Sequence, residues 1–90
     1  MPGEIIRVNG AREEYPPADG RHYTLEEMQK AIGGGWIEIV HTKDGRRMVL
    51  DEEGKLKGFP VNHVATALYP YGSQDPIVGD VLVCDEGNID

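Results

Sequence analysis

Apolar residues recur every three or four positions in two stretches of the chain. In the first, Leu25, Met28 and Ile32 share one face of a helix that is predicted to begin at Thr24. Thr24 and Glu27 have the Thr-x-x-Glu spacing of a capping box, in which each side chain accepts a hydrogen bond from the other's backbone N–H. The pattern therefore predicts an amphipathic helix that ends at the triple glycine following it, because glycine takes the left-handed conformation of a helix end without strain.

The second helical stretch begins at a proline. Pro60 suits the first position of a helix, where its missing N–H costs no hydrogen bond. Val64 and Leu68, with their apolar neighbours, then mark a stripe on one helical face. The spacing predicts a second amphipathic helix, with Asn62 and His63 on its more exposed side.

Alternation of apolar and polar residues predicts the strands. Asn9-Gly10 and Asp44-Gly45 are turn pairs that suit hairpins, and a short strand is also expected around Leu56. The stretch 77–84 is the most apolar, and a near-continuous apolar run is typical of a strand inside a sheet, here expected to be covered by helices on one side. The other strands are expected at residues 4–8, 12–15, 36–42 and 46–51.

The order of these elements predicts the fold class. Hairpins combined with two amphipathic helices favour an α+β fold with a single, mostly antiparallel sheet and both helices packed on one face. We expect residues 1–90 to form one domain. Residues 1–21 would hold an N-terminal strand or hairpin and a Pro-rich loop, residues 22–85 the core, and residues 86–90 a flexible tail.

Charge is distributed unevenly along the chain. The formal net charge is −7, of which residues 1–50 carry −1 and residues 51–90 carry −6. An acidic half repels phosphate backbones, so direct binding of nucleic acid is not expected. The acidic residues either keep a small protein soluble or face a basic partner, as a mimic of nucleic acid would.

Two further features narrow the class of protein. No apolar run approaches the roughly 20 residues that a membrane span needs, and the first residues lack the layout of a signal peptide. The single cysteine, Cys84, excludes a disulfide within the chain. We therefore expect a cytoplasmic protein.

Several segments resemble one small family, the domain of unknown function 3846. The resemblance covers roughly residues 22–85 and includes the helix at 24–34, the strand at 36–40 and the closing segment 75–83. It is most specific in Glu53-Gly54-Lys55-Leu56 and in Gly58-x-Pro60-x-Asn62. Members often carry arginine after the asparagine, where this chain has His63. The resemblance implies a small intracellular accessory protein of bacteria, their phages or plasmids, and it brings no catalytic residue.

Residues that could bind a metal or act as nucleophiles are scattered. His22, His41, His63 and Cys84 could contribute to a zinc site, but they lack the close pairs of such sites, so neither a metal nor a cofactor is expected. Cys84 lies at the end of an apolar strand beside Asp85, where a buried thiol with a raised pKa is expected rather than a nucleophile.

The start of the second helix is the candidate ligand site. A helix N-terminus with two nearby lysines can hold an anion, including the phosphate of a nucleotide, and aromatic rings could stack on a base. The alternative is that the asparagine caps its own helix and that the tyrosines only pack in their loop. The candidate ligand-binding residues are Lys55, Lys57, Asn62, His63, Tyr69 and Tyr71.

These observations predict a small non-catalytic accessory protein of a phage, prophage or plasmid. It would act by stoichiometric binding of a host protein or of a nucleotide-like small molecule. The alternative is an acidic decoy on a basic host surface, whose complexes would weaken steeply with salt. An enzyme that uses His63 with a carboxylate lacks a visible oriented partner. A homodimer could form through an exposed edge strand of the N-terminal segment.

Overall fold

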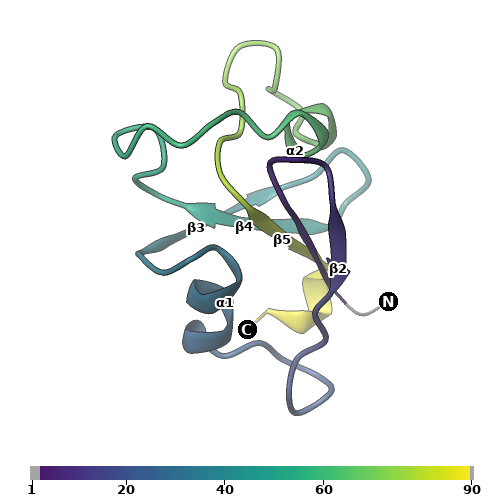
Figure 1. Ribbon diagram of the computed structural model, residues 1–90. Coiled ribbons are helices and arrows are strands. Elements are labelled where there is room, and N and C mark those ends of the chain that lie inside the picture. Colours follow the sequence, from purple (N-terminus) through teal and green to yellow (C-terminus); the bar gives the residue numbers. More distant parts are fainter. Residues whose placement is uncertain (1–2, 90) are drawn as a thin grey trace.

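Figure 1 shows the computed structural model of the chain, which describes residues 3–89. Within these residues, five strands form one antiparallel sheet in the order β2-β1-β5-β4-β3. The α+β class and the antiparallel sheet predicted from the sequence are therefore confirmed. The elements are β1 (Glu4–Ile6), β2 (Arg12–Glu14), α1 (Leu25–Ala31), β3 (Ile37–His41), β4 (Arg47–Asp51), α2 (His63–Leu68), β5 (Val81–Cys84) and a 3-10 helix, η1 (Glu86–Asn88).

The helices α1 and α2 cover opposite faces of the sheet, as Figure 1 shows. On one face, Met28 of α1 packs in a core with Val49 of β4, whereas on the other Ala65 of α2 packs in a core with Met48. The expectation that both helices share one face is therefore wrong. The physical reason lies in β4 and β5, which are apolar at consecutive positions. Alternating side chains of such strands are buried on both sides, so each side needs its own cover.

The first helix begins as the sequence predicts. The Thr24 hydroxyl accepts a hydrogen bond from the Glu27 N–H at 3.1 Å, and the Glu27 carboxylate accepts one from the Thr24 N–H at 2.8 Å. Tyr23 and Met28 meet in the core on the α1 face, as a hydrophobic staple does. The helix ends where Gly33 takes a φ of +93°, a conformation that side chains with a Cβ rarely adopt.

Two segments differ from the predicted strands. Leu56 is 86% exposed in a series of turns that spans residues 52–58, so it forms no strand. Strand β5 begins only at Val81, because Gly79 takes a φ of +79° and interrupts the extended backbone. Before this break, Val78 forms a single bridge with Val61.

The end of the chain is tied to the loop before α1. The Tyr23 N–H donates to the Asn88 carbonyl at 2.9 Å, and the Asn88 side-chain amide donates to the Arg21 carbonyl at 2.8 Å. Ile89 packs against the core on the α1 face. The sequence predicted a flexible tail at residues 86–90. In the structure, residues 86–89 make these contacts with the rest of the protein, and Asp90 lies outside the described residues. No helix in the described part of the chain is long and apolar enough to cross a membrane.

Candidate functional site

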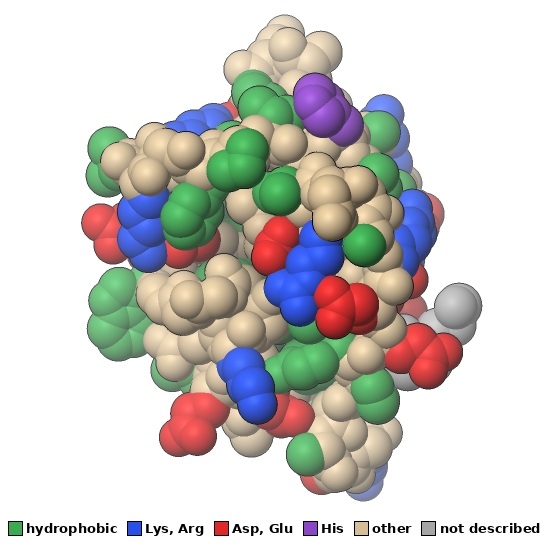
Figure 2. All heavy atoms as spheres, in the orientation of Figure 1, with side chains coloured by type: hydrophobic (Ala, Val, Ile, Leu, Met, Phe, Trp, Pro, Cys, Tyr) green, Lys and Arg blue, Asp and Glu red, His purple; other side chains and the backbone are tan. Residues whose placement is uncertain are grey.

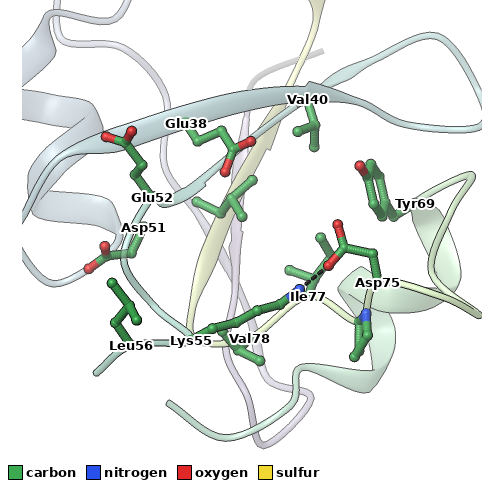
Figure 3. Close-up of a pocket in the computed structure, with 12 residues that line it drawn as sticks. Glu38, Val40, Asp51, Glu52, Lys55, Leu56, Tyr69, Asp75, Ile77 and Val78 are labelled. Atoms are coloured by element: carbon green, nitrogen blue, oxygen red, sulfur yellow. Dashed lines mark hydrogen bonds and ion pairs between the residues drawn. The ribbon is translucent and has the colours of Figure 1, made fainter. Parts of the chain in front are cut away.

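A cavity of about 240 Å³ lies on the α2 face of the sheet, beside the edge strand β3. The β3–β4 hairpin forms one wall, and the turns after β4 and the loop before β5 form the others (Figure 3). Its lining comprises Glu38, Val40, Leu50, Asp51, Glu52, Lys55, Leu56, Tyr69 and residues 75–78.

Strand alternation explains which side chains reach the cavity from the sheet. In the β3–β4 register, Glu38 lies opposite Leu50, and Val40 lies two residues further along on the same face. Leu50 and Val40 also pack in the core on the α2 face, together with Ile77 and Tyr69. The cavity therefore has an apolar base continuous with this core, and the polar groups stand at its rim.

The charged groups at the rim are predominantly acidic. Lys55 extends along the cavity, and its ammonium forms an ion pair with Asp75 (Figure 3). Glu38 points into the same space from β3, whereas Glu52 and Asp51 point away from it (Figure 3). Among the described residues, Glu38 has neither an ion pair nor a hydrogen bond of its side chain. The cavity thus holds one carboxylate without a counter-ion and a second one neutralised by a lysine of this chain.

The lysine at position 57 has an internal role. Its ammonium lies 2.7 Å from the Asp51 carboxylate, which is 4% exposed and also accepts the Glu53 N–H at 2.8 Å. The same ammonium lies 5.7 Å from the centre of the Phe59 ring. A buried carboxylate requires such a counter-ion. Lys57 is therefore not available to hold an external anion, contrary to the expectation from the sequence.

Asn62 is fully buried, and its side chain is occupied by the protein itself. It caps α2 by accepting the Ala65 N–H at 3.1 Å. Its amide donates to the carbonyls of Ile6 at 2.9 Å and Gly79 at 3.0 Å. The alternative considered from the sequence, a helix cap, is therefore correct, and a ligand-binding role for Asn62 is wrong. Because these partners come from distant segments, no local pattern could have revealed them.

The remaining candidate residues lie in different places. His63 is exposed at the start of α2 and does not line the cavity. Tyr69 lines the cavity. The Tyr71 ring packs edge-to-face against the Tyr69 ring, with ring centres 5.6 Å apart, but Tyr71 is 62% exposed and does not line the cavity. Of the residues proposed from the sequence, the structure therefore brings only Lys55 and Tyr69 to one site, and it adds Glu38 and Asp75 to them.

Other features offer less. Among the described residues, no group of three or more His, Cys, Asp or Glu side chains is placed to hold a metal ion. Cys84 is 2% exposed, and burial raises the pKa of its thiol to about 11, as expected for an inert cysteine. A wider hollow of about 520 Å³ lies around Pro17, Arg21 and Asn88, where turns and the C-terminal segment meet.

A comparison with family models identifies the family of this chain. Residues 5–90 match the family described as domain of unknown function (DUF3846), so the chain belongs to this family. The match confirms the resemblance noted from the sequence and extends it to the N-terminal strand. Neither a curated protein nor a solved structure matches the chain.

Proposed function

We propose that this member of the DUF3846 family is a non-catalytic binding protein whose cavity receives a lysine or arginine side chain of a partner protein. The observation that supports this function is the unpaired Glu38 at the rim of an apolar-based cavity. A long basic side chain suits such a place, because its stem packs on apolar surface while its charged end meets a carboxylate.

Lys55 already occupies the cavity in this manner. Its stem follows the cavity wall and its ammonium reaches Asp75 (Figure 3). We expect a lysine side chain of the partner to bind in the same way. An incoming basic group would pair with Glu38, and it would compete with Lys55 for Asp75.

The size and charge of the cavity favour a side chain over a nucleotide. Pockets for small molecules commonly measure about 300–1,000 Å³, and this cavity measures about 240 Å³. Glu38 and Asp75 would repel a phosphate group, and Lys57 is held by Asp51. Of the two ligand classes that the sequence left open, the protein partner is therefore the better supported.

A decoy that imitates nucleic acid is less well supported. Such a mimic needs a surface field of one sign. On the face in Figure 2, acidic and basic side chains are interspersed. We also propose that the protein is a cytoplasmic accessory protein of a phage, prophage or plasmid, as the resemblance to this family implies.

The test uses small probes of the side chain itself. We expect N-acetyl-lysine amide and N-acetyl-arginine amide to shift the NMR signals of Glu38 and Asp75, and the neutral norleucine analogue to shift neither. Glu38→Gln should abolish the effect, whereas Glu14→Gln, a change on the exposed strand β2, should leave it intact. Lys55→Met should tighten binding by up to about fivefold, because it removes an exposed competing ion pair worth about 0.2–1 kcal/mol. Equal binding of the norleucine analogue would refute the proposed function.

A further inference from the structure

The outer side of β3 carries backbone groups without partners. The Glu52 N–H donates to the Trp36 carbonyl at 2.9 Å, and the Thr42 N–H donates to the Arg46 carbonyl at 3.0 Å. Because hydrogen-bonded pairs alternate in an antiparallel ladder, the even-numbered residues of this strand bond to β4. The N–H and C=O groups of Ile37, Ile39 and His41 therefore point away from the sheet. Within residues 3–89 they meet no hydrogen-bonding partner.

The opposite edge of the sheet is protected. Strand β2 has three residues, all of them charged and exposed. Arg12 pairs with Glu4 at 2.8 Å, and Glu13 pairs with Arg7 at 2.5 Å. Short, charged strands are a common way to prevent a sheet from adding further strands. The N-terminal edge that the sequence suggested for a homodimer is therefore the less suitable of the two.

Strand β3 lacks this protection. It has five residues, it contains neither lysine nor proline, and Ile39 on its α1 side is exposed. Trp36, directly before the strand, is 62% exposed.

The two faces of β3 set the chemistry of a strand that pairs with it. Glu38 stands on the α2 face beside the cavity, and Ile37 and Ile39 stand on the α1 face. Directly opposite residues of paired strands have Cβ atoms about 4.5–5.5 Å apart. A basic residue opposite Glu38 would therefore form an ion pair and extend over the cavity. Its neighbours in the added strand would face Ile37 and Ile39, where β-branched apolar side chains fit.

We propose that the outer edge of β3 binds an extended segment of a partner protein as an additional strand, with an apolar–basic–apolar sequence centred opposite Glu38. This inference rests on the proposed function, because the same basic side chain fills the cavity. Backbone hydrogen bonds to Ile37, Ile39 and His41 supply affinity, and the Glu38 pair selects the partner and its register.

Charge argues against a second copy of this chain as the occupant. Strand β3 offers no lysine or arginine to a symmetric partner. Antiparallel pairing of two copies centred on Glu38 or Ile39 would place their Glu38 side chains directly opposite or diagonal to each other, which is unfavourable. Each copy also has a net charge of −7.

The probe is an acetylated, amidated heptapeptide that alternates valine with lysine, added to the ¹⁵N-labelled full chain. At a concentration about ten times its Kd, we expect amide exchange at Ile37, Ile39 and His41 to slow about tenfold. The amides of Glu38 and Val40, which already bond to β4, should not change. Two peptides that are N-methylated at alternate sets of amides should differ in their affinity for the protein, since only one set faces β3. If both bind equally well, or if binding leaves the three outer amides unprotected, the inference is overturned. Self-association that protects them in the absence of peptide overturns it as well.

Matched variants separate the edge from the cavity. Ile39→Pro removes one outward N–H and should abolish peptide binding, while Ile39→Thr, which keeps this N–H, should retain it. Binding of N-acetyl-lysine amide should be unaffected by Ile39→Pro, which shows that the cavity is intact. A second peptide carries norleucine in place of lysine. If it protects the outer amides equally well, the proposal that the cavity binds a basic side chain is refuted, whereas strand addition at β3 is supported. If the proline and threonine variants bind the peptide equally well, only the proposal of strand addition at β3 is refuted.

Discussion

Replacing Asn62 by alanine removes hydrogen bonds that hold α2 to β1 and to the loop before β5. The alanine leaves the Ala65 N–H without its cap, which costs about 1 kcal/mol. It also leaves the carbonyls of Ile6 and Gly79 buried without this donor, at about 1 kcal/mol or more each. We therefore expect Asn62→Ala to lower the free energy of unfolding by about 3 kcal/mol, a large part of the 5–15 kcal/mol typical of a domain.

Urea unfolding followed by far-UV circular dichroism measures this loss. Far-UV signals are preferable to fluorescence, because Trp36 is largely exposed and reports little on the core. The matched control is Asn9→Ala, since Asn9 is an exposed asparagine that accepts only the Ala11 N–H among the hydrogen bonds of the described residues. We expect the control to cost less than about 1 kcal/mol. If the two variants unfold within about 0.5 kcal/mol of each other, the structural role assigned to Asn62 is refuted.

An aspartate at position 62 tests the contacts with the Ile6 and Gly79 carbonyls separately from the helix cap. Asn62→Asp keeps the oxygen that caps Ala65, but its carboxylate would lie against the Ile6 and Gly79 carbonyls. Burial and these acceptors should raise its folded-state pKa above the unfolded value of about 3.9. The unfolded state then loses its proton first, so the stability of this variant, relative to Asn62→Ala, should fall as pH rises above about 4. A relative stability that rises with pH would contradict this account.

Two further predictions concern α1 and Cys84. Thr24→Ala should lower the free energy of unfolding by about 1 kcal/mol in urea, because the capping box loses its hydroxyl, and an unchanged midpoint would argue against the cap. Burial raises the pKa of Cys84 from 9.0 to about 11, so the thiol of the unfolded chain ionises first. The free energy of unfolding should therefore fall between pH 9 and 11, and it should fall less in Cys84→Ala. Rapid alkylation of this thiol by iodoacetamide in the folded protein at pH 8 would contradict its burial.

Local patterns predicted the elements whose residues lie close together in the chain. The capping box of Thr24 and Glu27 joins residues three positions apart, and the turn after Asp44 depends on its neighbouring glycine. Asn62 shows the limit of local patterns, because the sequence indicated its cap only as the alternative to a ligand site and did not indicate its amide contacts. These contacts reach 56 and 17 residues along the chain, to Ile6 and Gly79.

The apolar pattern of β4 already indicates that the two helices lie on opposite faces of the sheet. Strand β4 is apolar at Met48, Val49 and Leu50, which must point to alternate faces. Such a strand is buried on both sides, so one helix on each face follows from the pattern. The apolar run at 77–84 favours the same conclusion, because all four residues of β5 are buried, and the expectation that helices cover it on one side only is wrong.

The sequence by itself determined the fold class, the capped start of α1 and the family of this protein. Only the tertiary structure decided which charges meet. Lys55 reaches Asp75, 20 residues away, and Lys57 neutralises Asp51, so both lysines predicted to hold an anion are paired within the protein. The cavity beside Glu38 is acidic instead. The physical reason is range: caps and turns depend on contacts within a few residues, whereas the sign of charge in a cavity depends on how distant segments pack.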